Sequence, residues 1–331
     1  MNLKFSILQL FLGSAFALGL TIIGPSGSAE AQSFSGFVNL SSGHSIYVEY
    51  QAPTEGKDTL VLINGLDSEE TGWQFFVNAF APTGFGILRF DPYGMGFTLA
   101  KSGPVMSTIS MDSQVEDLNE LTMKLGLTGK LNLLGHSYGG GMAIAFAGRH
   151  PDRIKNAILL CPYTKPIAGV DTFIKGQISA YKMMNPFNIQ SNESLYDYFL
   201  QLDELTIFPT EDPLLLTSPL KPMAVYELTQ GIRKYNMDAA SQFFPANSVH
   251  LVLAEADELI APDVLASFWN QLPAGSRASF MKIQNSPHRV PQVYPMVLAE
   301  WAAEILNQNP LVYGAHEFEA NPMTNAIQEI R

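Results

Sequence analysis

The sequence predicts a doubly wound, mostly parallel α/β sheet with an inserted helical cap. A β-hairpin at residues 34–50 precedes repeated strand–helix units that run to about residue 161. A stretch rich in methionine and aromatic residues, without a strand pattern, follows at about residues 162–247. It is longer than any connection that a compact domain normally needs, and two more strands come after it. The 331 residues therefore suit either one large α/β domain with an insertion or two domains.

Each element follows from its own local pattern. The hairpin strands alternate partly between apolar and polar residues and flank a turn. Short apolar runs predict the other strands, at residues 58–63, 86–90, 130–134, 156–161, 249–253 and 278–283. Helical spacing predicts helices at residues 73–80, 110–125, 140–149 and 291–306. The run at 278–283 is expected to be the last strand, because the chain after residue 307 is polar and weakly patterned.

These elements divide the chain into five expected segments. They are a signal peptide at 1–31, the first part of the α/β core at 32–164, the helical cap at 165–247, the second part of the core at 248–306 and a C-terminal tail at 307–331.

The first 31 residues have the features of an export signal. Lys4 supplies a positive charge before the apolar stretch 5–23, and Ala29 and Ala31 are the small residues that a signal peptidase reads. An uncleaved anchor is the alternative, since the stretch is near the lower limit for a membrane span. We expect cleavage after Ala31, export to the periplasm or the medium of a bacterium, and no stable membrane insertion afterwards.

Composition restricts the partners of the chain. Hydrophobic residues make up 47% of it, which is ample for a sizeable core, and its net charge is −12. An acidic chain without basic clusters is not expected to bind nucleic acid or to adsorb to an anionic membrane. We expect a small-molecule partner instead, and the oligomeric state stays open.

The most informative motif is Gly-x-Ser-x-Gly at residues 135–139, with Ser137 at its centre. It lies between the expected strand 130–134 and a helix of small residues, which is the context that a nucleophile elbow requires. A serine hydroxyl is a poor nucleophile at neutral pH, so Ser137 needs a base. Of the six histidines, His288 is the candidate, because it follows the last expected strand in a loop.

A base of this kind needs a carboxylate that fixes its tautomer. Asp257 lies in the loop after the strand 249–253, and the order Ser137, Asp257, His288 suits this arrangement. Glu255 and Glu258 share that loop, and Asp91 follows another strand, so these three are rival acids.

A serine nucleophile also needs donors for the oxyanion. The main-chain amide of Tyr138 is one candidate, and that of Leu66, or of a residue next to it, is the second. Cys161, the single cysteine, is expected to be a buried strand residue without a catalytic role.

Together the motifs identify a family. Asn64-Gly65 with Trp73 downstream, the segment 91–96, the segment 135–140, Asp257 and His288 resemble the α/β-hydrolase superfamily, in its branch of serine esterases and lipases. The family usually has His-Gly where this chain has Asn64-Gly65. The resemblance implies a serine hydrolase acting on an ester or thioester. Because the nucleophile position holds Ser137 and not the aspartate that haloalkane dehalogenases and epoxide hydrolases use, those two chemistries are disfavoured.

Three alternatives remain on the same triad: a lactonase, a peptidase or a lyase. A ligand-binding protein with little turnover is an alternative from another class, because a fold does not fix a function. The sequence contains neither a metal-ligand cluster nor a phosphate-binding loop, so we expect no cofactor and no metal. The apolar cap suggests a substrate with a hydrophobic group.

Overall fold

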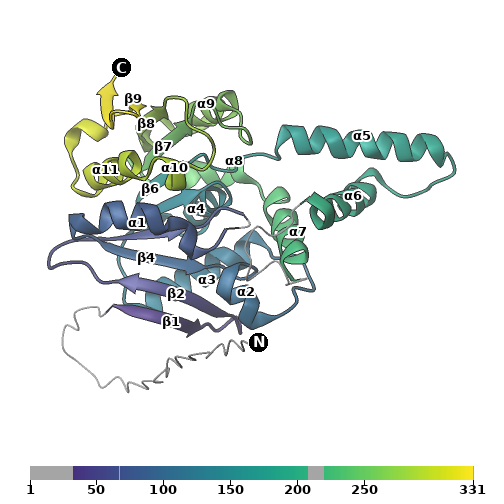
Figure 1. Cartoon of the computed structure of the whole chain (residues 1–331), viewed down its shortest axis with the longest axis horizontal. Coiled ribbons are helices and arrows are strands. Elements are labelled where there is room, and N and C mark those ends of the chain that lie inside the picture. Colours follow the sequence, from purple (N-terminus) through teal and green to yellow (C-terminus); the bar gives the residue numbers. More distant parts are fainter. Residues whose placement is uncertain (1–32, 67, 208–219, 331) are drawn as a thin grey trace, which may run out of the picture. The chain divides into compact units, whose positions relative to one another are not determined.

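The computed structural model describes residues 33–66, 68–207 and 220–330 (Figure 1). The described part contains one ten-stranded sheet in the order β1-β2-β4-β3-β5-β6-β7-β8-β9-β10. The strands are β1 (Phe34–Asn39), β2 (Ser45–Gln51), β3 (Thr59–Ile63), β4 (Gly86–Asp91), β5 (Leu131–His136), β6 (Ile154–Leu160), β7 (Val249–Ala254), β8 (Arg277–Ile283), β9 (His316–Asn321) and β10 (Ala326–Glu329).

The sheet is mostly parallel, as the alternation of strands and helices predicts. The hairpin β1–β2 and the pair β2–β4 are antiparallel, whereas the seven strands from β4 through β9 run parallel. Every residue of β5 and β7 is buried, which fits strands covered by helices on both faces. The carboxyl ends of the parallel strands therefore meet at one edge of the sheet.

Helices cover both faces of this sheet. In Figure 1, α1 and α11 lie on the near side and α3 and α4 lie behind the strands. The α-helices are α1 (Gln74–Phe80), α2 (Gly96–Ser102), α3 (Met111–Lys124), α4 (Tyr138–Arg149), α5 (Ala168–Met184), α6 (Asn192–Ile207), α7 (Leu220–Arg233), α8 (Met237–Ala240), α9 (Pro262–Gln271), α10 (Val290–Val293) and α11 (Pro295–Leu306). The closing helix expected at 291–306 is thus two helices, and the break precedes Pro295, which occupies the first turn of α11.

The helical insertion is confirmed. Helices α5 to α8 lie between β6 and β7, and no strand occurs in the described part of residues 165–247. Helices α5 and α6 have a small core of their own, formed by Ile174, Ile178, Leu195, Tyr196 and Leu200. Among the described residues, no helix combines the length and the apolar character that crossing a membrane requires.

The expectation that 278–283 is the last strand is wrong. Strand β9 pairs with β8 in parallel, and β10 continues the sheet as an antiparallel edge. The strand β9 buries only Phe318 and Ala320, and a glutamate directly precedes each of them. Two apolar residues are too few to show a strand period in the sequence. The strand is stabilised instead by a tertiary contact between Phe318 and Trp301, whose ring centroids are 4.8 Å apart.

Candidate active site

Ser137 lies at a sharp turn between the end of β5 and the start of α4. Its φ of 53° and ψ of −113° are unusual for a residue with a side chain. The turn requires glycine on both sides, because a Cβ on Gly135 would lie 2.2 Å from the carbonyl oxygen of Gly139. A Cβ on Gly139 would lie 2.2 Å from the carbonyl oxygen of Ile63. The sequence motif therefore forms the geometry of a nucleophile elbow.

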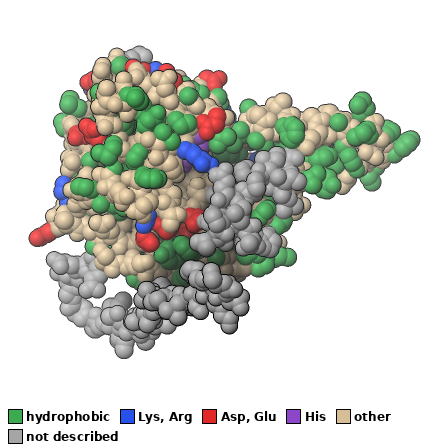
Figure 2. Space-filling model, in the orientation of Figure 1, with side chains coloured by type: hydrophobic (Ala, Val, Ile, Leu, Met, Phe, Trp, Pro, Cys, Tyr) green, Lys and Arg blue, Asp and Glu red, His purple; other side chains and the backbone are tan. Residues whose placement is uncertain are grey.

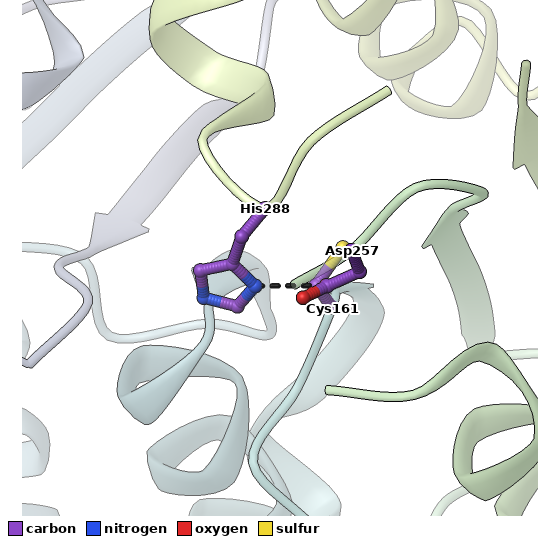
Figure 3. A group of neighbouring side chains, drawn as sticks. All are labelled: Cys161, Asp257 and His288. Atoms are coloured by element: carbon purple, nitrogen blue, oxygen red, sulfur yellow. Dashed lines mark hydrogen bonds and ion pairs between the residues drawn. The ribbon is translucent and has the colours of Figure 1, made fainter. Parts of the chain in front are cut away.

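The loops after β7 and β8 bring Asp257 and His288 together. Nδ1 of His288 lies 2.8 Å from Oδ2 of Asp257, and their side chains are 5% and 0% exposed (Figure 3). The other oxygen, Oδ1, accepts hydrogen bonds of 2.8 Å from the amides of Leu259 and Ile260. Burial would raise the pKa of Asp257, but the hydrogen bond from His288 and those two amides lower it below its usual value. The carboxylate is thus held charged and oriented toward the imidazole.

The rival acids have other partners. Glu255 accepts hydrogen bonds from Asn285 N at 2.9 Å and from Lys282 Nζ at 3.2 Å. Glu258 accepts one from the main-chain amide of His288, at 3.0 Å, rather than from its ring. Asp91 lies buried beneath another loop, so only Asp257 contacts the ring of His288 among the four carboxylates considered.

His136, the residue before Ser137, connects the elbow to His288. Its Nε2 lies 2.9 Å from the carbonyl oxygen of His288, and the two ring centroids are 4.7 Å apart. Burial, with the neighbouring His288, lowers the pKa of His136 to about 3, so its ring is neutral and Nε2 donates to that carbonyl. The sequence gives no sign of this role, because nothing local to His136 indicates a partner 152 residues away.

The residue before Ser137 is therefore bonded to the main chain of His288. Among the hydrogen bonds of the described residues, none joins the Ser137 hydroxyl to His288. Such bonds are often long or poorly aligned without substrate, and they tighten when substrate binds.

Cys161 is buried, as expected, but it lies directly after β6 and next to the acid–base pair. Its Sγ and the ligand atoms of Asp257 and His288 all lie within 4.8 Å of one another (Figure 3). Burial raises the pKa of this thiol, which disfavours the thiolate that a metal requires. With Asp257 already accepting three hydrogen bonds, the cluster suits an acid–base pair better than a metal site.

The two candidate oxyanion donors come from different parts of the chain. Tyr138 is the first residue of α4, where main-chain amides have no partner within the helix. Leu66 belongs to the loop after β3, and this loop passes close to the elbow. A Cβ on Gly65 would lie 3.1 Å from His136 Nδ1 and 3.6 Å from Ser137 Cβ.

The side chain of Asn64 connects the loop after β3 to β4 and to Trp73 by hydrogen bonds. Its Nδ2 donates to Phe90 O at 3.0 Å and to Asp91 Oδ1 at 3.3 Å, and its Oδ1 accepts from Trp73 Nε1 at 2.9 Å. Both halves of the amide are used, since its NH2 group donates and its oxygen accepts. The departure from the family's His-Gly is therefore accommodated by Trp73 and Asp91.

Asp91, which accepts from Asn64, and Glu70, whose amide donates to Asp91, are buried carboxyls with raised pKa values. Burial raises the pKa of Asp91 to about 6, although the amides of Glu70 and Phe97 donate to it at 2.7 and 2.8 Å. Burial also raises the pKa of Glu70 to about 7, although Arg89 Nε lies 2.8 Å from its Oε2. These groups were not among the expected site residues, apart from Asp91 as a rival acid.

Comparison with known proteins decides the family. The model of the family described as "Serine aminopeptidase, S33" matches residues 54–290. The chain belongs to this family of α/β hydrolases. The predicted superfamily is thereby confirmed, and the protein is an enzyme of the α/β-hydrolase class.

Relatives of this S33-family chain are hydrolases. A 2-hydroxy-6-oxononadienedioate/2-hydroxy-6-oxononatrienedioate hydrolase of Paraburkholderia phymatum is 35% identical over 133 residues, which are 38% of this chain and 43% of that protein. The chain thus spans about half the length, or less, of the first curated relatives it matches.

Solved structures share the fold over most of the chain. An α/β hydrolase named MGS-M2, from a Medee basin deep-sea metagenome library, has a TM-score of 0.61 at 19% identity, covering 83% of this chain and 98% of its own. The enol-lactonase of Burkholderia xenovorans LB400 has a TM-score of 0.57 at 15% identity, covering 82% and 99%. At these identities the likeness concerns the fold alone.

Proposed function

We propose that this protein is an exported serine hydrolase that cleaves a carboxylic ester or thioester through Ser137, His288 and Asp257. The observations that support the proposal are the strained backbone of Ser137 at the turn between β5 and α4, the bond from its neighbour His136 to the carbonyl of His288, and the buried His288–Asp257 pair. Such strain is retained where it serves a function, and an idle serine would not require it.

The reaction follows from the positions of these groups. Ser137 Oγ attacks the carbonyl carbon while Nε2 of His288 takes its proton, and the amides of Leu66 and Tyr138 donate to the oxyanion. The Asp257 carboxylate stabilises the imidazolium that forms. His288 then gives the proton to the leaving alcohol or thiol, and water releases the acid from the acyl-enzyme by the same steps in reverse.

The helical insertion is the feature that suggests a substrate class. Helices α5 to α7 supply a cap with many apolar side chains, which favours a substrate with a hydrophobic acyl or alcohol group. Residues 1–31, on which export depends, lie outside the described residues. Export is tested by the N-terminal sequence of the protein recovered from the periplasm or the medium, which should begin at Gln32.

A lactonase, a peptidase or a lyase would use the same residues. The family description names an aminopeptidase, and the curated relative from Paraburkholderia phymatum is named for a dienedioate substrate. A panel of p-nitrophenyl esters of graded acyl length, acyl thioesters, a lactone and an aminoacyl anilide separates these classes by kcat/KM. A ligand-binding protein would turn over none of them.

The first experiment is labelling with a fluorophosphonate, followed by mass mapping of the modified peptide. We expect stoichiometric modification at Ser137, abolished by Ser137→Ala and by His288→Ala. Ser179→Ala is the matched control, because this serine lies on α5 and bonds only to the Lys175 carbonyl of its own helix. A folded protein that takes up no label would contradict the proposal.

A further inference from the structure

The connection between α5 and α6 exposes a cluster of large apolar side chains. We call residues 183–189 the arm tip. Figure 2 shows hydrophobic side chains gathered over these two helices and the turn that joins them. The exposed fractions at the tip are high, at 80% for Met183, 72% for Met184, 94% for Phe187 and 99% for Ile189. Side chains this exposed contact almost nothing in the protein, so packing does not explain them.

Several polar groups of the arm tip are hydrogen-bonded, within the tip or to the last turn of α5. Asn188 N donates to Asn185 O at 2.9 Å, which closes a turn with Pro186 at its second position. The side chain of Asn185 donates to Tyr181 O at 3.0 Å, and Gln190 N donates to Asn188 Oδ1 at 2.9 Å. These bonds hold the turn in one conformation, with the exposed side chain of Phe187 at its third position.

The charge of this segment differs from that of the rest of the chain. The protein has a net charge of −12, yet residues 172–192 contain Lys175 and Lys182 and no Asp or Glu. Lys175 is paired with Asp171 at 2.6 Å, so Lys182 is the charge that remains near the tip. Lys182 bonds to the side chain of Asn192, and its position next to the tip suits a phosphate group at the level of the turn. The overall acidity that argues against membrane adsorption thus does not apply to the arm tip.

We propose that the arm tip inserts reversibly into the interface of a phospholipid bilayer. Phe187 and Ile189, with Met183 and Met184, enter the boundary between headgroups and acyl chains, and Lys182 stays at the headgroups. This proposal agrees with the expectation that the protein has no stable membrane insertion, because a turn of this size adsorbs to a bilayer and does not cross it.

A second copy of the chain is a poorer occupant. A stable protein interface needs roughly 20–30 residues on each side. Among the described side chains of α5, α6 and their connection, the large apolar ones that are at least 72% exposed are the four at the tip. These four large apolar side chains are exposed to between 72% and 99%, so a protein partner would have to enclose the turn. Lipid is fluid and encloses a protruding turn without a shaped pocket.

Tryptophan fluorescence of the full chain tests this directly. The three native indoles, Trp73, Trp269 and Trp301, are buried, so they report little on lipid. In Phe187→Trp, we expect a blue-shifted emission and about twofold quenching of the added fluorescence by vesicles of brominated phosphatidylcholine and phosphatidylglycerol. Met323→Trp is the matched control, because Met323 is 86% exposed in the turn between β9 and β10. Its emission should not respond.

Changing Met183, Met184 and Ile189 to Ser in the Phe187→Trp background should abolish the quenching. Equal responses of Phe187→Trp and Met323→Trp, or none from Phe187→Trp, would overturn the proposal. A blue shift that needs no vesicles and grows with protein concentration would show contact between copies instead. The readout uses no substrate, so its failure leaves the proposed hydrolase activity untouched.

Discussion

The carboxylate of Glu258 accepts a hydrogen bond of 3.0 Å from the main-chain amide of His288. The adjacent Asp257 accepts one of 2.8 Å from the ring Nδ1 of the same histidine. Two neighbouring carboxylates thus hold one histidine by two different groups. Only the bond from the ring stabilises the imidazolium, so their contributions to catalysis can be separated by substitution.

Asp257→Asn should lower kcat by about 10³–10⁴-fold, because an amide at this position favours the wrong tautomer of His288. Glu258→Gln should lower kcat by about tenfold at most, since its amide oxygen still accepts the same main-chain bond. Steady-state kinetics on a p-nitrophenyl ester measures both. Equal losses in the two variants would show that the roles are not divided in this way.

The elbow glycines give a prediction about stability and labelling together. In Gly139→Ala the new methyl would lie 2.2 Å from Ile63 O, so either β3 or α4 must shift. We expect about 3 kcal/mol less free energy of unfolding in urea, and loss of fluorophosphonate labelling. Gly129→Ala is the control, because a Cβ there meets nothing within 4 Å. A Gly139→Ala protein that labels normally would contradict the elbow geometry.

The sequence predicts the candidate site well because its residues follow strands. Ser137, Asp257 and His288 each come just after a parallel strand, and the carboxyl ends of those strands share one sheet edge. The roles of His136 and Asn64 could not be predicted from the sequence, because His288 and Asp91, to which they bond, are distant in sequence. The strand β9 escapes for a related reason, since it is specified by contact with α11 and β8 rather than by its own alternation.

Asn64 is expected to act as a positioning residue for the loop that carries Leu66. Asn64→Ala removes the bonds to Phe90 O and Asp91 and leaves Trp73 Nε1 without its acceptor. We expect kcat to fall about tenfold with little change in KM, because the loop supplies an oxyanion donor used mainly in the transition state. The free energy of unfolding should fall by about 1–3 kcal/mol.

Trp73→Phe separates these two effects, since it removes only the indole donor and leaves Asn64 bonded to β4. The kcat of Trp73→Phe should fall less than the kcat of Asn64→Ala. If Asn64→Ala raises KM and leaves kcat unchanged, Asn64 shapes the substrate pocket and does not position the loop.

Glu70 gives the fold a pH dependence of known sign. Its pKa is raised from 4.5 to about 7 by burial, so the folded state holds a proton that the unfolded chain has released between these values. The free energy of unfolding should therefore fall as the pH rises from about 4.5 to about 7, by up to about 3 kcal/mol, and this contribution should stay constant above that range. Glu70→Gln keeps the shape of the protonated carboxyl and removes its titration.

Urea unfolding of the parent protein and of Glu70→Gln at intervals between pH 4.5 and 7.5 measures this effect. The difference in stability between the two proteins should grow in favour of the variant across this window. Glu300→Gln, at an exposed position on α11, is the control and should follow the parent protein throughout. Parallel curves for the parent protein and Glu70→Gln would mean that Arg89, 2.8 Å from the carboxyl, keeps Glu70 charged in spite of its burial.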